Sequence, residues 1–368
     1  MPYFIFTQVL QTHIKNSTII MGNCCANPTP QMTDTIEYQE QVTIRIKEKD
    51  SKGRVIRHDD VSFKVTGPVS QLNENYSLDN LNLLLSTCVL PGQDPRQLIN
   101  KDCQDACVCI FHENSLLLAL FDGHGKEGQR VASFCINFMR DYFTTCHTLF
   151  KNDAEKAIKK MIVDCDDSLR QKTSKIDSSL SGSTAVVTYL TSEGIHVASV
   201  GDSRAILATV PSDNLSVGSY EAAHNPYTRK IEPTRQLAAV CLSVDQKPNH
   251  EVELERIERH GGKVQQLTDD FGNKVGPFRV WQKNGILPGL AMSRSIGDNV
   301  AKEIGVIAEP IYHFFPHIHF RDQFLVMASD GVWDVMENLE VVNFVERFRK
   351  KCLKKSGPRA YPHRVIDI

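Results

Sequence analysis

The stretch Leu116–Gly125, LLLALFDGHG, constrains the fold of this chain more than any other feature. Its six leading residues are apolar, which predicts a buried strand that is too short to span a membrane. The strand ends in Asp122, and burying a carboxylate is unfavourable unless a base, a proton or a metal neutralises it. Gly123 and Gly125 flank His124, so the backbone there can turn sharply and come close to a bound group.

A second strand-end Asp-Gly step lies near the C-terminus. Phe324–Ala328 is apolar and is followed by Ser329, Asp330 and Gly331. One Asp-Gly step alone is more often a β-turn. Its repetition after two apolar runs favours a shared site, in which both carboxylates form one cluster if the two strands lie side by side.

The composition is that of a globular protein with a sizeable core, since 41% of the 368 residues are hydrophobic and 23% are charged. Lys+Arg 42 against Asp+Glu 44 gives a net charge of −2, so we expect no nucleic-acid partner. Eleven irregularly spaced cysteines fit a reducing, cytoplasmic environment better than a disulfide framework. Residues 1–20 lack the basic start and apolar core of a secretory signal.

Residues 1–40 predict an unstructured N-terminal segment with a candidate acylation site at 21–26, MGNCCA. If translation begins at Met21, Gly22 becomes N-terminal and is a myristoylation site, with Cys24 and Cys25 beside it as palmitoylation sites. Two lipid chains would be needed for stable attachment to the cytosolic face of a membrane. The alternative is an unstructured tail with two unmodified cysteines.

Residues 41–75 predict a hairpin and a linker. Val42–Ile46 and Val55–Val65 are strand-like runs on either side of a charged turn, and they form either an accessory piece or the edge of the main sheet. Gly67 and Pro68 open a polar stretch, so we expect the large domain to cover residues 76–368.

Several periodic or irregular segments complete the coarse prediction. Gln129–Phe143 has the apolar spacing of a helix, Asp153 can cap a second helix, and Leu267–Leu287 predicts an irregular insertion. The remaining predicted helices are Glu251–Arg259, capped by Asn249, and Glu340–Arg349, capped by Asn338.

Two cysteine groupings invite a chemical interpretation that the spacing does not support. Cys103, Cys107 and Cys109 lack the C-x-x-C pairs of a zinc site, so buried structural thiols are favoured. Cys146 and His147 are adjacent, but in a helix-like stretch neighbouring residues do not face each other. The sequence also contains no G-x-S-x-G, P-loop or H-E-x-x-H motif.

The acidic residues predict a site for a hard cation. Asp122 and Asp330 supply carboxylate oxygens, and the Gly123 carbonyl is a natural further ligand. Oxygen ligands favour Mg²⁺ or Mn²⁺ over Zn²⁺, and two such ions lower the pKa of a bridging water and bind a phosphoryl group. His124 is then a proton donor to the leaving oxygen, the alternative being a structural histidine. Three further acidic residues complete an outer ring through water: Asp105, Asp202 and Asp334.

Five ordered motifs resemble the PPM-type (type-2C) metal-dependent protein serine/threonine phosphatases. The resemblance extends from about Tyr76 to Arg349 and implies an α+β fold, a β-sandwich of two antiparallel sheets flanked by helices in four αββα layers. The motifs are FDGHG at 121–125, SGSTAV at 181–186, VGDSRAIL at 200–207, LAMSRSIGD at 290–298 and ASDGVWD at 328–334.

This resemblance implies hydrolysis of phosphoserine and phosphothreonine on phosphoprotein substrates by a metal-activated water. It implies two Mg²⁺ or Mn²⁺ ions bound by Asp122, the Gly123 carbonyl and Asp330, with His124 as the general acid. Asp105 matches a residue that holds metal-bound water, and Asp202 and Asp334 match a third, weaker metal position. The segment between Ser243 and Arg294 includes the family's substrate-facing flap, and we expect a monomer.

Two departures from the family pattern matter. The family usually has a basic residue shortly before the Asp105 position that holds the phosphate, and Lys101 is the candidate here. A lysine would act there as a point charge, whereas an arginine could bind two phosphate oxygens. The family's closing strand, with its metal ligand, has no clear counterpart after Arg349, although Asp367 could imitate the ligand. A pseudophosphatase, a membrane-tethered phosphoprotein-binding module with an incomplete metal site, is therefore the alternative.

Overall fold

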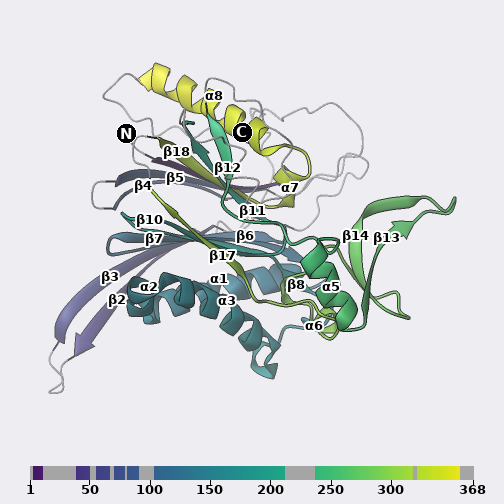
Figure 1. The fold of residues 1–368 in the computed structure, drawn as a ribbon. Helices are drawn as coiled ribbons and strands as arrows, with labels where there is room; N and C mark the ends of the chain where they lie inside the picture. The colour runs from purple at the N-terminus through teal and green to yellow at the C-terminus, as the bar shows by residue number, and fades with distance from the viewer. Residues whose placement is uncertain are drawn as a thin grey trace, which may run out of the picture.

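The protein is a β-sandwich covered by helices on both outer faces (Figure 1). The structure is a computed structural model and describes residues 3–10, 39–49, 55–66, 70–78, 81–90, 103–211, 237–317 and 321–356.

The first sheet contains the first and the last strand of the described chain. Its strands are β1 (Tyr3–Leu10), β4 (Ser70–Leu78), β5 (Leu81–Leu90), β11 (Arg204–Thr209), β12 (Ala238–Cys241) and β18 (Asp322–Ala328). Their order is β12-β11-β18-β1-β5-β4. β1 runs parallel to both of its neighbours, whereas the remaining pairs are antiparallel.

The second sheet is antiparallel throughout and is built around a central hairpin of β6 and β7. Its main strands, in spatial order, are β17 (Ile311–Pro316), β10 (Gly194–Val200), β9 (Ala185–Leu190), β7 (Ser115–His124), β6 (Asp105–His112), β3 (Val55–Thr66) and β2 (Gln39–Lys49). Two short strands extend it beside the end of β7, namely β8 (Gly182–Ser183) and β16 (Ile296–Gly297).

The helices form the two outer layers and a smaller lateral unit (Figure 1). They are α1 (Gly128–Thr145), α2 (His147–Asn152), α3 (Ala154–Arg170), η1 (Lys172–Ser174), α5 (Glu251–Arg259), α6 (Asn299–Lys302), α7 (Asp330–Trp333) and α8 (Asn338–Ser356). Helices α1 and α3 cover the second sheet, and α8 covers the first.

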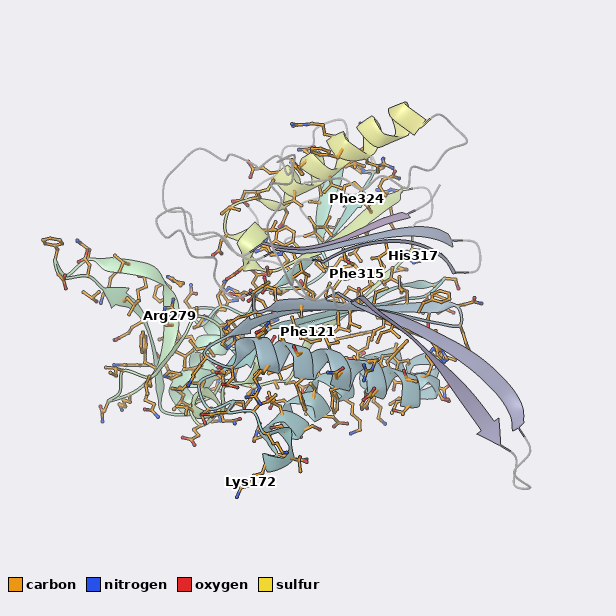
Figure 2. The ribbon with its side chains drawn as sticks, turned by 180° about the vertical axis from the view of Figure 1, so that it is seen from behind. Phe121, Lys172, Arg279, Phe315, His317 and Phe324 are labelled. Atoms are coloured by element: carbon orange, nitrogen blue, oxygen red, sulfur yellow. The ribbon has the colours of Figure 1, made fainter. Side chains whose placement is uncertain are left out.

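In the described residues the β-sandwich and its covering helices enclose three apolar layers, marked in Figure 2 by Phe121, Phe315 and Phe324, and the lateral unit has a separate apolar cluster. Phe121 packs between the second sheet and α1 and α3, Phe315 lies between the two sheets, and Phe324 lies between the first sheet and α8. β7 contributes alternate residues to two of these layers, which explains its uninterrupted apolar run, because a strand buried on both faces has no polar side.

This architecture confirms the predicted α+β sandwich with flanking helices. The structure differs from the expected unstructured segment over residues 1–40 at β1, where the backbone of Tyr3–Leu10 pairs with two strands from distant parts of the chain. β1 also makes the first sheet mixed instead of antiparallel. Asp367 and residues 357–368 lie outside the described part of the chain, as do residues 11–38.

The predicted hairpin of residues 41–75 belongs to the main sheet, since β3 pairs with β6 over Ser62–Thr66. A domain boundary at Tyr76 would fall inside β4, whose backbone pairs with β5 from Ser70 to Leu78. Of the two interpretations of this hairpin, the structure supports an edge of the main sheet and not an accessory piece.

The insertion predicted as irregular over Leu267–Leu287 is a third sheet, and that prediction was wrong. Its strands are β13 (Gly262–Thr268), β14 (Lys274–Gln282) and β15 (Pro288–Leu290). Most side chains of β13 are partly or fully exposed, so the sequence shows no alternation of apolar and polar residues. Backbone pairing joins the three strands, and Val280 of β14 and Leu290 of β15 anchor the unit in an apolar cluster with Ile257 of α5.

Helix capping was predicted correctly in one case and wrongly in another. Asp153 caps α3 by accepting a hydrogen bond from the backbone N–H of Lys156 at 3.0 Å. The cap position of α5 is His250, without a side-chain hydrogen bond, so the prediction that Asn249 caps this helix was wrong.

Helix α5 is attached to the segment before β16 by a buried charge network. The Glu253 carboxylate pairs with Arg256 and Arg294, each at 2.6 Å, and accepts a hydrogen bond from the Ser293 hydroxyl at 2.6 Å. Burial alone would raise the pKa of Glu253, but hydrogen bonds from Arg256 and Arg294 outweigh it and hold the pKa at about 2.

We expect Glu253→Gln to lower the free energy of unfolding at pH 7 by roughly 2–3 kcal/mol. A carboxyl whose pKa is depressed in the folded state stabilises the protein above the unfolded-state pKa and loses that effect as the pH falls through the folded-state value. The difference between variant and wild type should therefore shrink from about pH 4.5 to about pH 2, measured by denaturant unfolding over a pH series. Glu255→Gln is the matched control, because Glu255 pairs with Arg259 at the exposed face of the same helix. If both substitutions change the free energy of unfolding equally, the buried charge network around Glu253 does not stabilise the fold as proposed.

Candidate active site

The hairpin of β6 and β7 brings two acidic residues face to face. Its register pairs Asp105 with Asp122 at one end and His112 with Ser115 at the other. Both aspartates are buried. Adjacent strands hold directly opposed side chains close together, so the two carboxylates share one small volume.

The end of β18 adds a third carboxylate. Asp330 follows Ser329, whose hydroxyl lies 3.5 Å from the Asp105 carboxylate. The charge of Asp122 raises the pKa of Asp330, as expected for neighbouring carboxylates. Asp334 lies one helical turn further along, where its backbone N–H donates to the Asp330 carbonyl at 2.8 Å. The two Asp-Gly steps bring their carboxylates together, but not through strands that lie side by side, because β7 and β18 belong to different sheets.

Asp202 reaches the same place from the turn between β10 and β11. A short chain of hydrogen bonds links this turn to the end of β7. The Asp122 backbone N–H donates to the Thr184 hydroxyl at 3.0 Å, and the hydroxyls of Thr184 and Ser203 lie 2.7 Å apart. The SGSTAV and VGDSRAIL motifs therefore position the two aspartates relative to each other.

The electrostatics of the cluster call for positive charge. Burial raises the pKa of Asp105 to about 7, and burial together with the charges of Asp122 and Asp202 raises the pKa of Asp330 to about 8. Burial and the nearby Asp105 also raise the pKa of Asp122 well above its usual range. A bound cation would remove this penalty.

The donor set fits a hard divalent cation. Among the described residues, the buried Oδ1 atoms of Asp105 and Asp202 have no hydrogen-bond partner. The clustered carboxylate ligands are oxygens. The nearby Cys103 thiol donates to the Asp105 carbonyl at 3.9 Å, and burial and the charge of Asp105 raise the pKa of this thiol to about 11, which disfavours a thiolate ligand. Cys103, Cys107 and Cys109 pack as buried thiols, as predicted. Oxygen-only sites suit Mg²⁺ and Mn²⁺.

Lys247 is a residue of this site that sequence reasoning missed. Its ammonium group lies 2.5 Å from the Asp202 carboxylate. Although burial alone would lower the pKa of Lys247, the charge of Asp202 outweighs it and raises the pKa above its ordinary value. A single lysine in a loop belongs to no motif, so it could be predicted only from the expectation that a buried Asp202 needs a positive charge beside it.

Gly123 occupies a position that no larger residue can fill. A Cβ there would lie 2.3 Å from the backbone oxygen of Gly128 and 2.7 Å from that of Gln104. The glycine therefore lets β7 continue directly from Asp122 to His124 between two other backbone segments.

His124 is held by Asp298, which ends the LAMSRSIGD motif and to which the sequence analysis gave no role. The His124 Nε2 lies 2.7 Å from the Asp298 carboxylate, and the side chains are 24% and 3% exposed. The Ser295 hydroxyl donates to the same carboxylate oxygen at 2.6 Å. Burial opposes protonation of His124, but the carboxylates of Asp298 and Asp122 outweigh it and raise its pKa.

Gly182 makes room for this pair. A Cβ at Gly182 would lie 2.2 Å from the Asp298 carboxylate oxygen. The SGSTAV motif thus supplies a glycine where the carboxylate that orients His124 passes against the backbone of β8.

Four predicted site residues cannot be placed. Lys101 and the lipidation candidates Gly22, Cys24 and Cys25 lie outside the described residues, so their roles stay predictions.

Comparison with known proteins identifies the group to which this geometry belongs. Residues 96–356 match the family described as "Protein phosphatase 2C". The chain belongs to the protein phosphatase 2C family. The resemblance inferred from the five motifs is therefore confirmed.

Two similar curated proteins of the phosphatase 2C family are plant proteins. Probable protein phosphatase 2C 34 of Arabidopsis thaliana is 33% identical over 264 residues, which cover 67% of this chain and 66% of the relative. Probable protein phosphatase 2C 48 of Oryza sativa subsp. japonica is 34% identical over 280 residues, covering 70% and 72%. The chain thus spans about two thirds of the length of these relatives.

Solved structures share the fold. A serine-threonine phosphatase 2C from Toxoplasma gondii superposes with a TM-score of 0.56 at 16% identity, covering 85% of this chain and 89% of that one. A C. elegans sex determining protein gives a TM-score of 0.51 at 20% identity, covering 77% and 57%. At these identities the likeness concerns the fold alone. In the described part of this phosphatase 2C chain, none of the helices combines the length and apolar character needed to cross a membrane.

We expect Lys247→Met to destabilise the metal-free protein by about 1–3 kcal/mol, because it leaves the buried Asp202 carboxylate without its cation. Saturating Mn²⁺ should reduce the difference in stability between Lys247→Met and the wild type, since a bound cation supplies the missing positive charge. Thermal and denaturant unfolding with chelator and with Mn²⁺ measure both effects. Lys160→Met is the matched control, because Lys160 pairs with Asp164 on the exposed face of α3. If Lys247→Met lowers the free energy of unfolding no more than the control does, the Lys247–Asp202 ion pair does not stabilise the site as proposed.

Proposed function

We propose that this chain is a protein serine/threonine phosphatase that hydrolyses phosphoserine and phosphothreonine. The observation that carries the proposal is the cluster of buried carboxylates beside the His124–Asp298 pair, in a chain of the phosphatase 2C family. The cluster provides the acidic ligands for a cation that binds phosphate, and the pair provides a proton donor next to it.

The cofactor we propose is Mg²⁺ or Mn²⁺, as two ions with a third, weaker one. When bound, such ions neutralise the phosphate charge and acidify water, which supplies the nucleophile for hydrolysis. We propose Asp122, the Gly123 carbonyl and Asp330 as principal ligands, because burial raises the pKa of both carboxyl groups and the charge of Asp122 raises that of Asp330 further. The residues proposed for water-mediated contacts or the weaker position are Asp105, Asp202 and Asp334.

His124 is proposed to protonate the leaving oxygen of serine or threonine. Its Nε2 is engaged by Asp298, and its buried Nδ1 has no hydrogen-bond partner among the described residues. Nδ1 is thus the nitrogen that can hold the proton to be transferred. Asp298 fixes the orientation of the ring and favours its protonated form.

We expect the full chain to release phosphate from a phosphothreonine peptide with Mn²⁺, and we expect both a chelator and Asp122→Asn to reduce release to background. Asp122 is the residue whose charge the cation would neutralise most directly, so its loss removes a ligand without a large change in shape. Phosphate release over time is the measurement.

Asp164→Asn, on the exposed face of α3, is the matched carboxylate control and should retain wild-type activity. Equally low release in the wild type, the chelated sample and Asp122→Asn would remove the enzymatic function. Binding of the phosphopeptide without turnover would then favour the alternative, a phosphoprotein-binding pseudophosphatase.

We expect His124→Gln to lower kcat for a phosphothreonine peptide by about 100-fold or more. Asp298→Asn should lower it about 10-fold, because the ring is less well oriented and less readily protonated. Both losses should be much smaller for p-nitrophenyl phosphate, whose leaving group needs little protonation. Steady-state kinetics with the two substrates measure this split.

The double variant separates an orienting role of Asp298 from a structural one. If Asp298 acts through His124, adding Asp298→Asn to His124→Gln should change kcat little further. Equal losses on both substrates, or additive losses in the double variant, would show that Asp298 acts on folding instead.

A further inference from the structure

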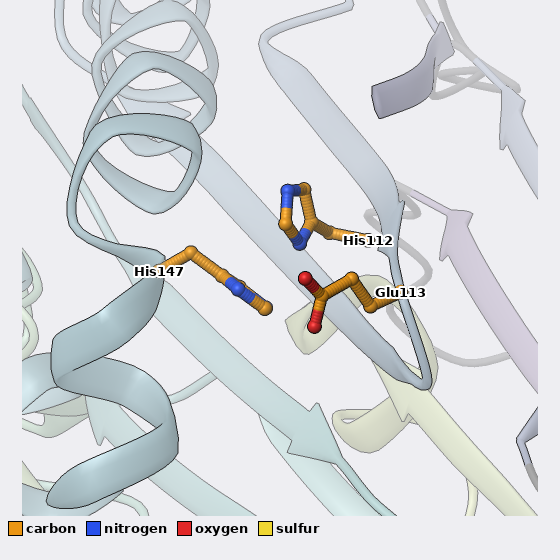
Figure 3. A group of neighbouring side chains, drawn as sticks. All are labelled: His112, Glu113 and His147. Atoms are coloured by element: carbon orange, nitrogen blue, oxygen red, sulfur yellow. The ribbon is translucent and has the colours of Figure 1, made fainter. Parts of the chain in front are cut away.

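A second cluster of ligand-type side chains lies at the opposite end of the β6–β7 hairpin from the aspartates. Figure 3 shows His112, Glu113 and His147 gathered around one point, two from the hairpin turn and one from the start of α2. His112 pairs with Ser115 at this end of the register, while Asp105 pairs with Asp122 at the other. The two clusters are therefore separated by the length of the strands.

Packing holds the two imidazoles in close contact. Their ring centroids lie 3.7 Å apart, and the residues are only 4% and 7% exposed. Phe143 places its ring edge-on to both, at centroid distances of 6.3 and 5.2 Å. The Ser115 hydroxyl donates to the His112 carbonyl at 2.9 Å and lies 3.2 Å from the His147 Nε2. The two rings are therefore held next to each other by their surroundings, and imidazole nitrogens are common ligands of transition metals.

Glu113 completes the donor set from the solvent side. One ligand atom from each of the three residues lies within 4.8 Å of the others. The Glu113 side chain is 25% exposed, so the cluster can be reached from water. Its backbone has a positive φ of 51°, a conformation unusual for a glutamate, which turns the chain between the two strands.

We propose that His112, Glu113 and His147 bind a transition-metal ion of the Zn²⁺ type, at a site separate from the acidic cluster. Two imidazoles and one carboxylate are a donor set for Zn²⁺, Co²⁺ or Ni²⁺, whereas Mg²⁺ prefers oxygens alone. The ion would join the β6–β7 turn to α2 and stabilise the folded protein. This inference does not depend on the proposed phosphatase activity.

Binding requires a small rearrangement that the cluster allows. Tetrahedral ligands about 2.1 Å from a metal lie roughly 3.4 Å from each other, so the donors must approach further. Glu113 can move, because its side chain is partly exposed. It must also leave Lys151, whose ammonium group pairs with its carboxylate. Lys151 therefore competes with the ion, and its removal should strengthen binding.

The test uses the full chain, treated with a chelator, dialysed and then kept in excess Mg²⁺ so that the acidic cluster is occupied. Titration with Co²⁺, followed by visible absorption, and with Zn²⁺, followed by calorimetry, should show one equivalent bound. Zn²⁺ should also raise the melting temperature. We expect Glu113→Gln to weaken binding at least 10-fold and Lys151→Met to strengthen it.

Two further variants separate the sites. His147→Gln should abolish the Co²⁺ absorption, and Asp122→Asn should leave it unchanged, because Asp122 lies at the other end of the hairpin. If His147→Gln fails to fold, Glu113→Gln still tests the donor set, since it keeps both imidazoles in place. Equal binding by the wild type and Glu113→Gln would overturn the proposal, as would loss of the absorption in Asp122→Asn or the absence of any binding at all.

Discussion

The pairing of β6 with β7 is the interaction on which the rest of the structure depends. It forces Asp105 against Asp122, an arrangement that two buried carboxylates do not favour on their own. The strands tolerate it because their central residues are packed between apolar layers on both faces of the sheet. Favourable burial along the middle of the hairpin thus stabilises an unfavourable concentration of negative charge at its end.

Hydrogen bonds and ion pairs of one arginine, Arg204, hold the loops around this negative charge in place. Arg204 makes a bidentate pair with Asp245, at 2.9 and 2.6 Å, and so fixes the loop that carries Lys247. The third guanidinium nitrogen donates to the Asn338 side chain at 2.6 Å, and the group stacks over Trp333 with a distance of 5.1 Å to the ring centroid. One arginine therefore connects the Asp202 turn, the Lys247 loop and the helical segment that contains Asp334.

The sequence allowed the acidic cluster to be predicted because each carboxylate interrupts a strong local signal, a strand or a tight turn. The roles of Asp298 and Lys247 could not be predicted, because their partners, His124 and Asp202, are distant in sequence and no periodicity relates them. The third sheet was missed for a different reason, since β13 has no buried face to produce alternation. The parallel pairing of β1 joins residues more than 300 positions apart, and nothing local in either strand specifies it.

The contact between Gly182 and Asp298 has a consequence for how this sequence can change. Gly182 does not have a positive φ, so its own backbone conformation would accept other residues, but a Cβ there would lie 2.2 Å from the Asp298 carboxylate oxygen and 2.6 Å from the Ile296 backbone oxygen. Shortening residue 298 would relieve only the first of these contacts, and it would also release His124. Position 182 therefore stays a glycine for two reasons, the backbone of the neighbouring strand and the carboxylate that holds the histidine.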